Sequence, residues 1–245
     1  MTRWKASGIH FSLSLMVGAI AFCLLYFVYY PQPYFEPAGA GKLVLMLLSV
    51  DVILGPLLTL VVFKSGKKSL KFDLSTIAAV QMAALIYGLH VMWIARPVFI
   101  VASVDRLEIV YAGDITDKAF AAAGFPQFSK EPLSGPLLAI TRRPNPGAEN
   151  AEVMQLTISG SDTQFYPRYY VPATPEAWAK FWKRAHKIED LPAHTRAVVE
   201  PYLESNPLKG KIMAVPMKGR VQDYTVLVGI DKNEMLVALP VSAWY

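Results

Sequence analysis

Three long apolar runs dominate the first hundred residues of the chain. Residues 8–35 carry no formal charge, residues 43–63 carry only Asp51, and residues 74–95 carry none. Each run reaches the roughly 20 apolar residues that a helix needs to cross the hydrocarbon core of a bilayer. The pattern therefore predicts three transmembrane helices, at about residues 8–30, 43–63 and 75–95.

The charges that flank these runs predict an orientation. Arg3 and Lys5 precede the first run, and residues 64–73 between the second and third carry four lysines. The loop of residues 31–42 carries one acid and one lysine. Because positive charge favours the cytoplasmic side, the N-terminus and the second loop are expected inside, and the part after the third run outside. The first run is too long for the apolar part of a signal peptide, so we expect it to be retained.

The hydrophobic pattern changes after residue 95. Seven basic and three acidic residues precede this point, so residues 96–245 hold 17 of the 24 basic and 16 of the 19 acidic residues. A segment of about 150 residues with nearly balanced charge has the size of one ordinary domain. We therefore predict a three-helix transmembrane region over residues 1–95 and an extracytoplasmic domain over residues 96–245.

Runs of β-branched and aromatic residues predict strands in this domain. The first, residues 96–113, would continue directly from the third apolar run. Thr116 is placed to cap a short helix that stops at Gly124. Residues 125–150 contain five prolines and are expected to be irregular apart from one short strand. The other predicted strands are residues 136–141, 151–158, 211–217, 223–230 and 235–241, of which the last two form a hairpin.

Two helices are predicted between these strands. The first covers residues 175–188, with Thr174 before it and Pro175 at its first position. The second covers residues 193–203. Because strands and helices come in separate runs, the domain is expected to be α+β with an antiparallel sheet.

The helix at residues 175–188 is amphipathic and basic, and its faces permit two interpretations. Trp178 and Trp182 recur on one face, while Lys183 belongs to the opposite one. Either the tryptophans pack on the sheet and the lysines are solvated, or this helix contacts anionic headgroups or a partner. We treat Trp178, Trp182 and Lys183 as candidate surface contacts.

Motifs for catalysis or metal binding are absent from the sequence. Cys23 is the single cysteine, and the four histidines have no spacing typical of a metal site. The lysine-rich loop lacks the glycine spacing of a nucleotide-binding loop. We predict no enzyme, no catalytic residue, no metal, no cofactor and no nucleic-acid partner.

Asp51 is the one acid inside an apolar run. Counted from Leu43, it lies roughly 12 Å into the predicted bilayer. An ionised acid at such depth costs about 2.5–3.5 kcal/mol on insertion scales, so Asp51 is expected to face other helices or be protonated. Tyr87 or His90 of the third run could bond its carboxyl group. The pair Gly55 and Pro56 is expected to bend the second helix.

Several stretches of this chain resemble the type IV pilin accessory proteins of the TfpX/TfpZ family. The most specific are DVILGPLLTLVVFK at residues 51–64 and RPVFIVASVDR at residues 96–106. The similarity implies a bacterial inner-membrane protein with a periplasmic domain that assists the major type IV pilin in assembly, stability or surface display, without catalysis. The family supplies no catalytic residues to transfer.

We hypothesise that the second and third helices form a groove for the apolar helix of a pilin. Small and polar residues support such contacts in lipid. The candidates are Ser49, Asp51, Gly55, Pro56, Thr59, Ala84 and Gly88, with Ala79 and Ala83 beside them. Two alternatives remain open. One is an envelope sensor with a ligand-binding periplasmic domain, and the other is a membrane enzyme with a polar cleft near Asp105, Asp162 or His186.

Overall fold

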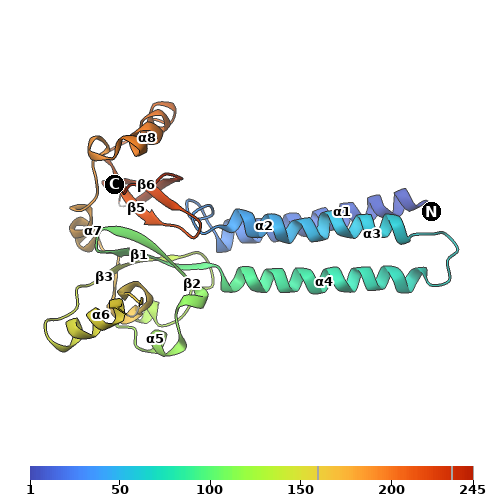
Figure 1. Ribbon diagram of the computed structural model, residues 1–245, viewed down its shortest axis with the longest axis horizontal. Coiled ribbons are helices and arrows are strands. Elements are labelled where there is room, and N and C mark those ends of the chain that lie inside the picture. The colour runs from blue at the N-terminus through green and yellow to red at the C-terminus, as the bar shows by residue number, and fades with distance from the viewer. Residues whose placement is uncertain (159, 233, 245) are drawn as a thin grey trace. The chain divides into compact units, whose positions relative to one another are not determined.

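The computed structural model describes residues 1–158, 160–232 and 234–244. The chain forms two compact units (Figure 1). The helical unit contains residues 1–28 and 40–94, and the α/β unit contains residues 29–39 and 95–245. Residues 29–39, which separate the first two helices along the chain, therefore belong to the α/β unit.

The helical unit consists of three long apolar helices. α1 (Arg3–Leu24) continues into a π-helical turn (Leu25–Tyr29). The second helix is built from α2 (Ala40–Ser49), a π-helical turn (Val50–Leu54) and α3 (Gly55–Val62), and the third is α4 (Leu70–Ile94). All three are long and apolar enough to cross a membrane. The prediction of three apolar N-terminal helices is confirmed.

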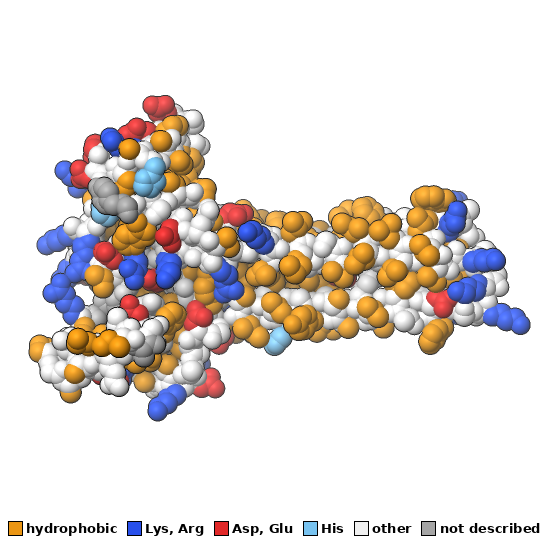
Figure 2. All heavy atoms as spheres, in the orientation of Figure 1, with side chains coloured by type: hydrophobic (Ala, Val, Ile, Leu, Met, Phe, Trp, Pro, Cys, Tyr) orange, Lys and Arg blue, Asp and Glu red, His pale blue; other side chains and the backbone are white. Residues whose placement is uncertain are grey.

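Large apolar side chains cover the outside of the helical unit. Figure 2 shows them along the length of the three helices. Such an apolar surface is unusual for a protein in water and suits the inside of a bilayer, where no hydrophobic driving force buries side chains between helices. Examples at least half exposed are Ile9, Ile20, Leu45, Ile53, Leu57, Val61, Val80 and Ile86.

The second helix changes its hydrogen bonding just before Pro56. Proline has no backbone N–H, and its ring collides with the preceding turn of a regular α-helix. The π-helical turn Val50–Leu54 widens the helix directly in front of Gly55 and Pro56. The structure shows a wider turn here, which contains Asp51, and the bend expected at this pair stays a prediction.

The α/β unit is built on a seven-stranded sheet with the order β4-β3-β1-β2-β5-β6-β7. β1 pairs with β3 and β2 pairs with β5 in parallel, and the other neighbours are antiparallel. The prediction of a purely antiparallel sheet is wrong. The long connection before β3 brings the chain to the end of the sheet at which β1 begins, and the one before β5 brings it to the end at which β2 begins, so each of these pairs is parallel. The strands are β1 (Pro97–Ser103), β2 (Arg106–Tyr111), β3 (Leu137–Thr141), β4 (Tyr170–Pro172), β5 (Ile212–Lys218), β6 (Asp223–Gly229) and β7 (Glu234–Leu239).

Two predicted strands have other structures. Residues 96–113 form the hairpin β1–β2 and not one strand, because the chain turns at Val104, whose φ is 45°. A β-branched residue rarely adopts this left-handed conformation, so the pattern of residues indicated no turn here. Residues 151–158 belong to a helix, α6 (Ala148–Ile158). Alanine, glutamate, methionine and leucine favour a helix there, and the short apolar run fits either structure.

The other helices lie close to their predicted positions. The side-chain hydroxyl of Thr116 caps α5 (Asp117–Ala121), and that of Thr174 caps α7 (Pro175–Trp182). α8 (Ala193–Ser205) follows. Both capped helices end earlier than predicted. The predicted hairpin of β6 and β7 is confirmed by their antiparallel pairing, although Asn233 in its turn lies outside the described residues.

Both faces of the central strands are buried. Along β1, Phe99 and Val101 belong to a cluster with Phe120, Phe128 and other residues on one face. On the other face, alternate residues of the same strands pack with the aromatic side chains of α7. A strand buried on both faces reads as a continuous apolar run, which is why β1 resembled an extension of the apolar N-terminal region.

The segment Tyr29–Gly39 is an integral part of the α/β unit. Tyr30 is fully buried, and the Tyr34 hydroxyl donates to Met235 Sδ of β7 at 3.3 Å. The backbone N–H of Arg220 donates to the carbonyl of Pro37 at 2.9 Å. No pattern in the sequence predicts that this short loop packs into the core.

Candidate functional site

Asp51 lies inside the helical unit and contacts α4. Its residue is 7% exposed. The Gln81 amide donates to the Asp51 backbone carbonyl at 3.1 Å and also lies beside the carboxyl group. Tyr87 and His90, the expected partners, are both exposed, so that prediction is wrong. Tyr87 and His90 were expected because they lie at a similar depth to Asp51. Depth does not determine which face of α4 meets the second helix, and the face that does so carries Gln81.

A second polar contact joins α1 to α3. The ring Nδ1 of His10 lies 2.6 Å from the Thr59 hydroxyl, and the Ser7 hydroxyl donates to the carbonyl of Pro56 at 2.8 Å. This carbonyl needs a partner because the region around Pro56 departs from regular helical bonding. Sequence reasoning missed Ser7, His10 and Gln81. The sequence offered one signal for these contacts. Ser7 and His10 are three residues apart, as are Pro56 and Thr59, so each pair can lie on one face of its helix.

Glycines allow the helices of this unit to approach closely. A Cβ added to Gly55 would collide with the end of the Gln81 side chain, and one added to Gly88 would collide with the end of the Leu47 side chain. Gly18 of α1 meets Leu48 in the same way, at 3.0 Å. Close approach through small residues is the usual basis of helix packing in lipid.

Most of the candidate pilin contacts are therefore used within the chain itself. Asp51, Gly55, Pro56 and Thr59 are buried in the helical unit. Ser49, Ala84 and Gly88 are half-exposed, and the Ser49 hydroxyl donates to a carbonyl of its own helix. Their contact with a pilin stays a prediction. The exposed positions of α3 and α4 are better placed for an external helix.

The two tryptophans of α7 lie in the hydrophobic core. Trp178 is 3% and Trp182 is 6% exposed, and their rings stack at a centroid distance of 4.5 Å. Of the two interpretations, packing on the sheet is the one observed, and a surface contact through either ring is wrong because neither reaches the surface. Lys183 is exposed at the end of the helix and remains available.

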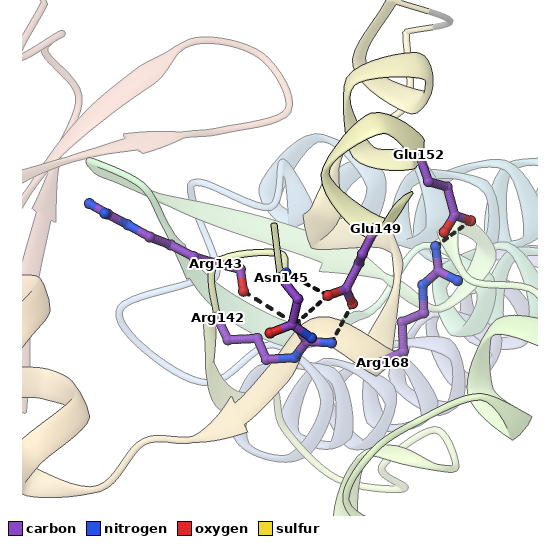
Figure 3. Close-up of polar contacts among 6 residues, drawn as sticks. All are labelled: Arg142, Arg143, Asn145, Glu149, Glu152 and Arg168. Carbon is purple, nitrogen blue, oxygen red and sulfur yellow. Dashed lines mark hydrogen bonds and ion pairs between the residues drawn. The ribbon is translucent and has the colours of Figure 1, made fainter. Parts of the chain in front are cut away.

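Ion pairs attach α6 to the rest of the α/β unit (Figure 3). Both terminal nitrogens of Arg142 donate to Glu149, at 3.1 and 2.5 Å, and Arg168 donates to Glu152 at 2.6 Å. Both guanidinium groups also lie over the ring of Tyr169, at 5.2 and 4.8 Å from its centroid. α6 has no buried residue, so its position depends on these charged contacts more than on apolar packing.

Acid is therefore expected to detach α6 selectively. The Arg142 guanidinium, with the backbone N–H of Asn145, lowers the pKa of Glu149 from 4.5 to about 2. A carboxyl group whose pKa is lower in the folded state than in the unfolded state stabilises the fold at pH values above its unfolded-state pKa. For Glu149 this stabilisation is lost as the pH falls from 4.5 towards 2. Hydrogen exchange of the α6 amides, corrected for the intrinsic pH effect, should accelerate over that range before exchange in β1 does.

A substitution tests the same ion pair at neutral pH. Glu149→Gln should increase exchange across α6 while leaving the sheet unchanged. Glu200→Gln, at an exposed position of α8, is the matched control and should change nothing. Equal protection of α6 in the Glu149→Gln variant and the wild type would contradict the role of this pair.

Within the described residues, no group of three or more His, Cys, Asp or Glu side chains could hold a metal ion. The residues considered for an enzyme are engaged separately. Asp105 pairs with Arg106 at 3.9 Å, Asp162 accepts from the N–H of Thr163 at 2.7 Å, and the backbone of His186 pairs with Ala214. A non-enzymatic role stays a prediction.

The fold and these contacts define a class of protein: three helices of membrane-spanning length joined to an α/β domain with a mixed sheet. Residues 1–39 match the family model described as fimbrial assembly protein FimB. A relative from Dichelobacter nodosus, the fimbrial assembly protein of serogroup I, is 36% identical over 174 residues, which are 70% of this chain and 67% of the relative. The serogroup E1 protein is 34% identical over the same shares.

The chain therefore belongs to the FimB family of fimbrial assembly proteins. A third relative, the protein of serogroups C1 and C2 from the same organism, is 42% identical over 113 residues, which are 45% of this chain and 86% of that protein. No solved structure matches this chain.

Proposed function

We propose that this chain is a non-enzymatic accessory protein of the bacterial inner membrane that assists a fimbrial subunit, the major type IV pilin, in assembly, stability or display. Its family supports a role in fimbrial assembly. The resemblance to the type IV pilin accessory proteins supports the choice of subunit.

The observation that carries the membrane location is the apolar surface of the helical unit. Val61 is 82% exposed and Leu45 is 72% exposed. Burying such side chains contributes roughly 25 cal/mol per Å² of apolar area, and a bilayer supplies that burial. The lysines at positions 64, 67, 68 and 71 lie between α3 and α4 and favour the cytoplasmic side for this loop. With this orientation, we propose a periplasmic location for the α/β unit.

The proposed partner contact involves the outer faces of α3 and α4. An assembly-competent pilin carries an apolar helix, and this helix would meet side chains that the helical unit leaves exposed. Contacts at the buried polar residues would require the three helices to separate. The exposed side chains Leu57, Val61, Val80 and Ile86 are therefore the positions to probe.

In-cell photo-crosslinking from these four positions tests the proposal. A photoreactive residue at Leu57, Val61, Val80 or Ile86 should give an adduct that antibodies to the fimbrial subunit detect. Ile9 and Ile20 of α1, which are comparably exposed, are matched controls and should give weaker or no adducts. If no position captures the subunit while the protein is present and inserted, direct contact through the helices is wrong, and the sensor hypothesis becomes the better one.

A further inference from the structure

A hollow of about 630 Å³ lies on the α/β unit, beside α7. Its floor is a row of neighbouring side chains across three strands: Ala102 of β1 pairs with Ile140 of β3, which pairs with Val171 of β4. Phe181 of α7 forms one side of this floor. The volume lies within the roughly 300–1,000 Å³ that is typical of ligand sites.

The rim of this pocket is basic. Arg142 and Arg143 follow β3 on one side, while Lys180 and Arg184 come from α7 and the turn after it on the other. Figure 2 shows Lys and Arg side chains gathered on the surface of the α/β unit over α7 and β3. The one acid of the lining is Glu176. The chain therefore places cations on opposite sides of an apolar hollow.

Two of these four cations are engaged by the protein. Arg142 pairs with Glu149, and Arg184 donates to the carbonyl of Val104. Figure 3 shows the Arg143 side chain extending away from Glu149. Among the described residues, neither Arg143 nor Lys180 has an acid within ion-pair distance, and both are exposed. Glu176 forms no ion pair with either cation among the described residues, so the lining holds one acid against four cations.

The lining indicates the chemistry of an occupant. An inorganic anion would fill a small part of this volume, since a water molecule occupies only about 30 Å³. A nucleic acid would need exposed rings for its bases to stack on, and Phe181, the aromatic residue of the lining, is buried. A polypeptide with alternating acidic and apolar side chains supplies carboxylates for the rim and apolar groups for the floor.

We propose that this pocket binds an acidic, partly apolar segment of another polypeptide, with Arg143 and Lys180 pairing with its carboxylates and the accessible side chains of Val104 and Val171 packing against its apolar side chains. The site is separate from the helix faces discussed above. Its existence does not depend on the identity of the fimbrial subunit.

Fluorescence anisotropy on the full-length protein in detergent micelles tests this proposal. The probes are a labelled short peptide of alternating Glu and Leu and its counterpart of alternating Gln and Leu. The acidic peptide should bind the wild type, and the double variant R143Q/K180Q should bind it about tenfold more weakly, as expected for two partly exposed charge pairs. The neutral peptide should bind more weakly than the acidic one to the wild type.

A matched variant separates the pocket from general attraction to a basic surface. K183Q/K187Q removes the same charge from exposed positions near the same helix but outside the lining. It should bind the acidic peptide within about twofold of the wild type. Equal weakening of both double variants would overturn the proposal, as would equal binding of the two peptides. Displacement of the acidic peptide by inorganic phosphate at constant ionic strength would assign the pocket to a small anion or a lipid phosphate and would also overturn it.

Discussion

Replacing Trp178 by alanine is expected to lower the free energy of unfolding of the α/β unit by about 3–5 kcal/mol, the usual range for a fully buried tryptophan. The ring of Trp178 stacks on that of Trp182, and its centroid lies 5.6 Å from the centroid of the Phe181 ring. Removing it leaves a cavity between α7 and the sheet that rigid neighbouring strands cannot close. Denaturant unfolding of the full-length protein in detergent, followed by near-ultraviolet circular dichroism, measures the change.

Lys183→Ala is the control for this substitution. Lys183 directly follows the last residue of α7, and its side chain is exposed, so its loss should change the free energy of unfolding by no more than about 0.5 kcal/mol. If the two variants unfolded at the same denaturant concentration, α7 would not be packed on the sheet as described.

The second large effect is expected at Glu131. Arg96 is 2% exposed, and its guanidinium donates to Glu131 at 2.6 Å. Glu131→Ala would leave a buried charge without its carboxylate, which costs about 3–5 kcal/mol when a buried pair is broken. Because Glu131 is itself 37% exposed, water can partly replace it, and we expect the lower end of that range. The same unfolding measurement applies.

Two further variants define what the Arg96 pair contributes. Glu234→Ala removes a carboxylate from an exposed pair with Lys232 at 3.9 Å and should cost at most about 1 kcal/mol. Replacing both members, as Arg96→Met with Glu131→Leu, should recover most of the loss, because the buried charge is removed together with its carboxylate. A Glu131→Ala variant as stable as Glu234→Ala would contradict the importance of this pair.

Elements with local signals were predictable from the sequence. Thr174 followed by Pro175 marks the start of α7, because capping and a preset φ depend only on neighbouring residues. The hairpin of β6 and β7 depends on two adjacent runs. The three apolar helices depend on length and composition alone. In each case the residues that determine the element lie in one continuous segment of the chain.

Features that depend on distant residues were not predictable. Whether β3 lies parallel to β1 is decided by the path of the chain between them. The sequence pattern of a strand does not indicate the direction of its neighbour. The partner of Asp51 is Gln81 because of the faces on which the helices meet. The cations of the basic pocket come from two separate segments, and only folding brings Arg143 and Lys180 to one rim.

The packing of Tyr29–Gly39 into the α/β unit has a consequence for how the protein is made. Tyr34 precedes its partner Met235 by 201 residues. At roughly 5–20 residues per second, the ribosome needs about 10–40 s to add that length of chain. The earliest part of the core is thus made long before the strand that completes it, and the α/β unit can finish folding only after β7 has been made. A fragment that begins at residue 95 would lack a piece of its own interior.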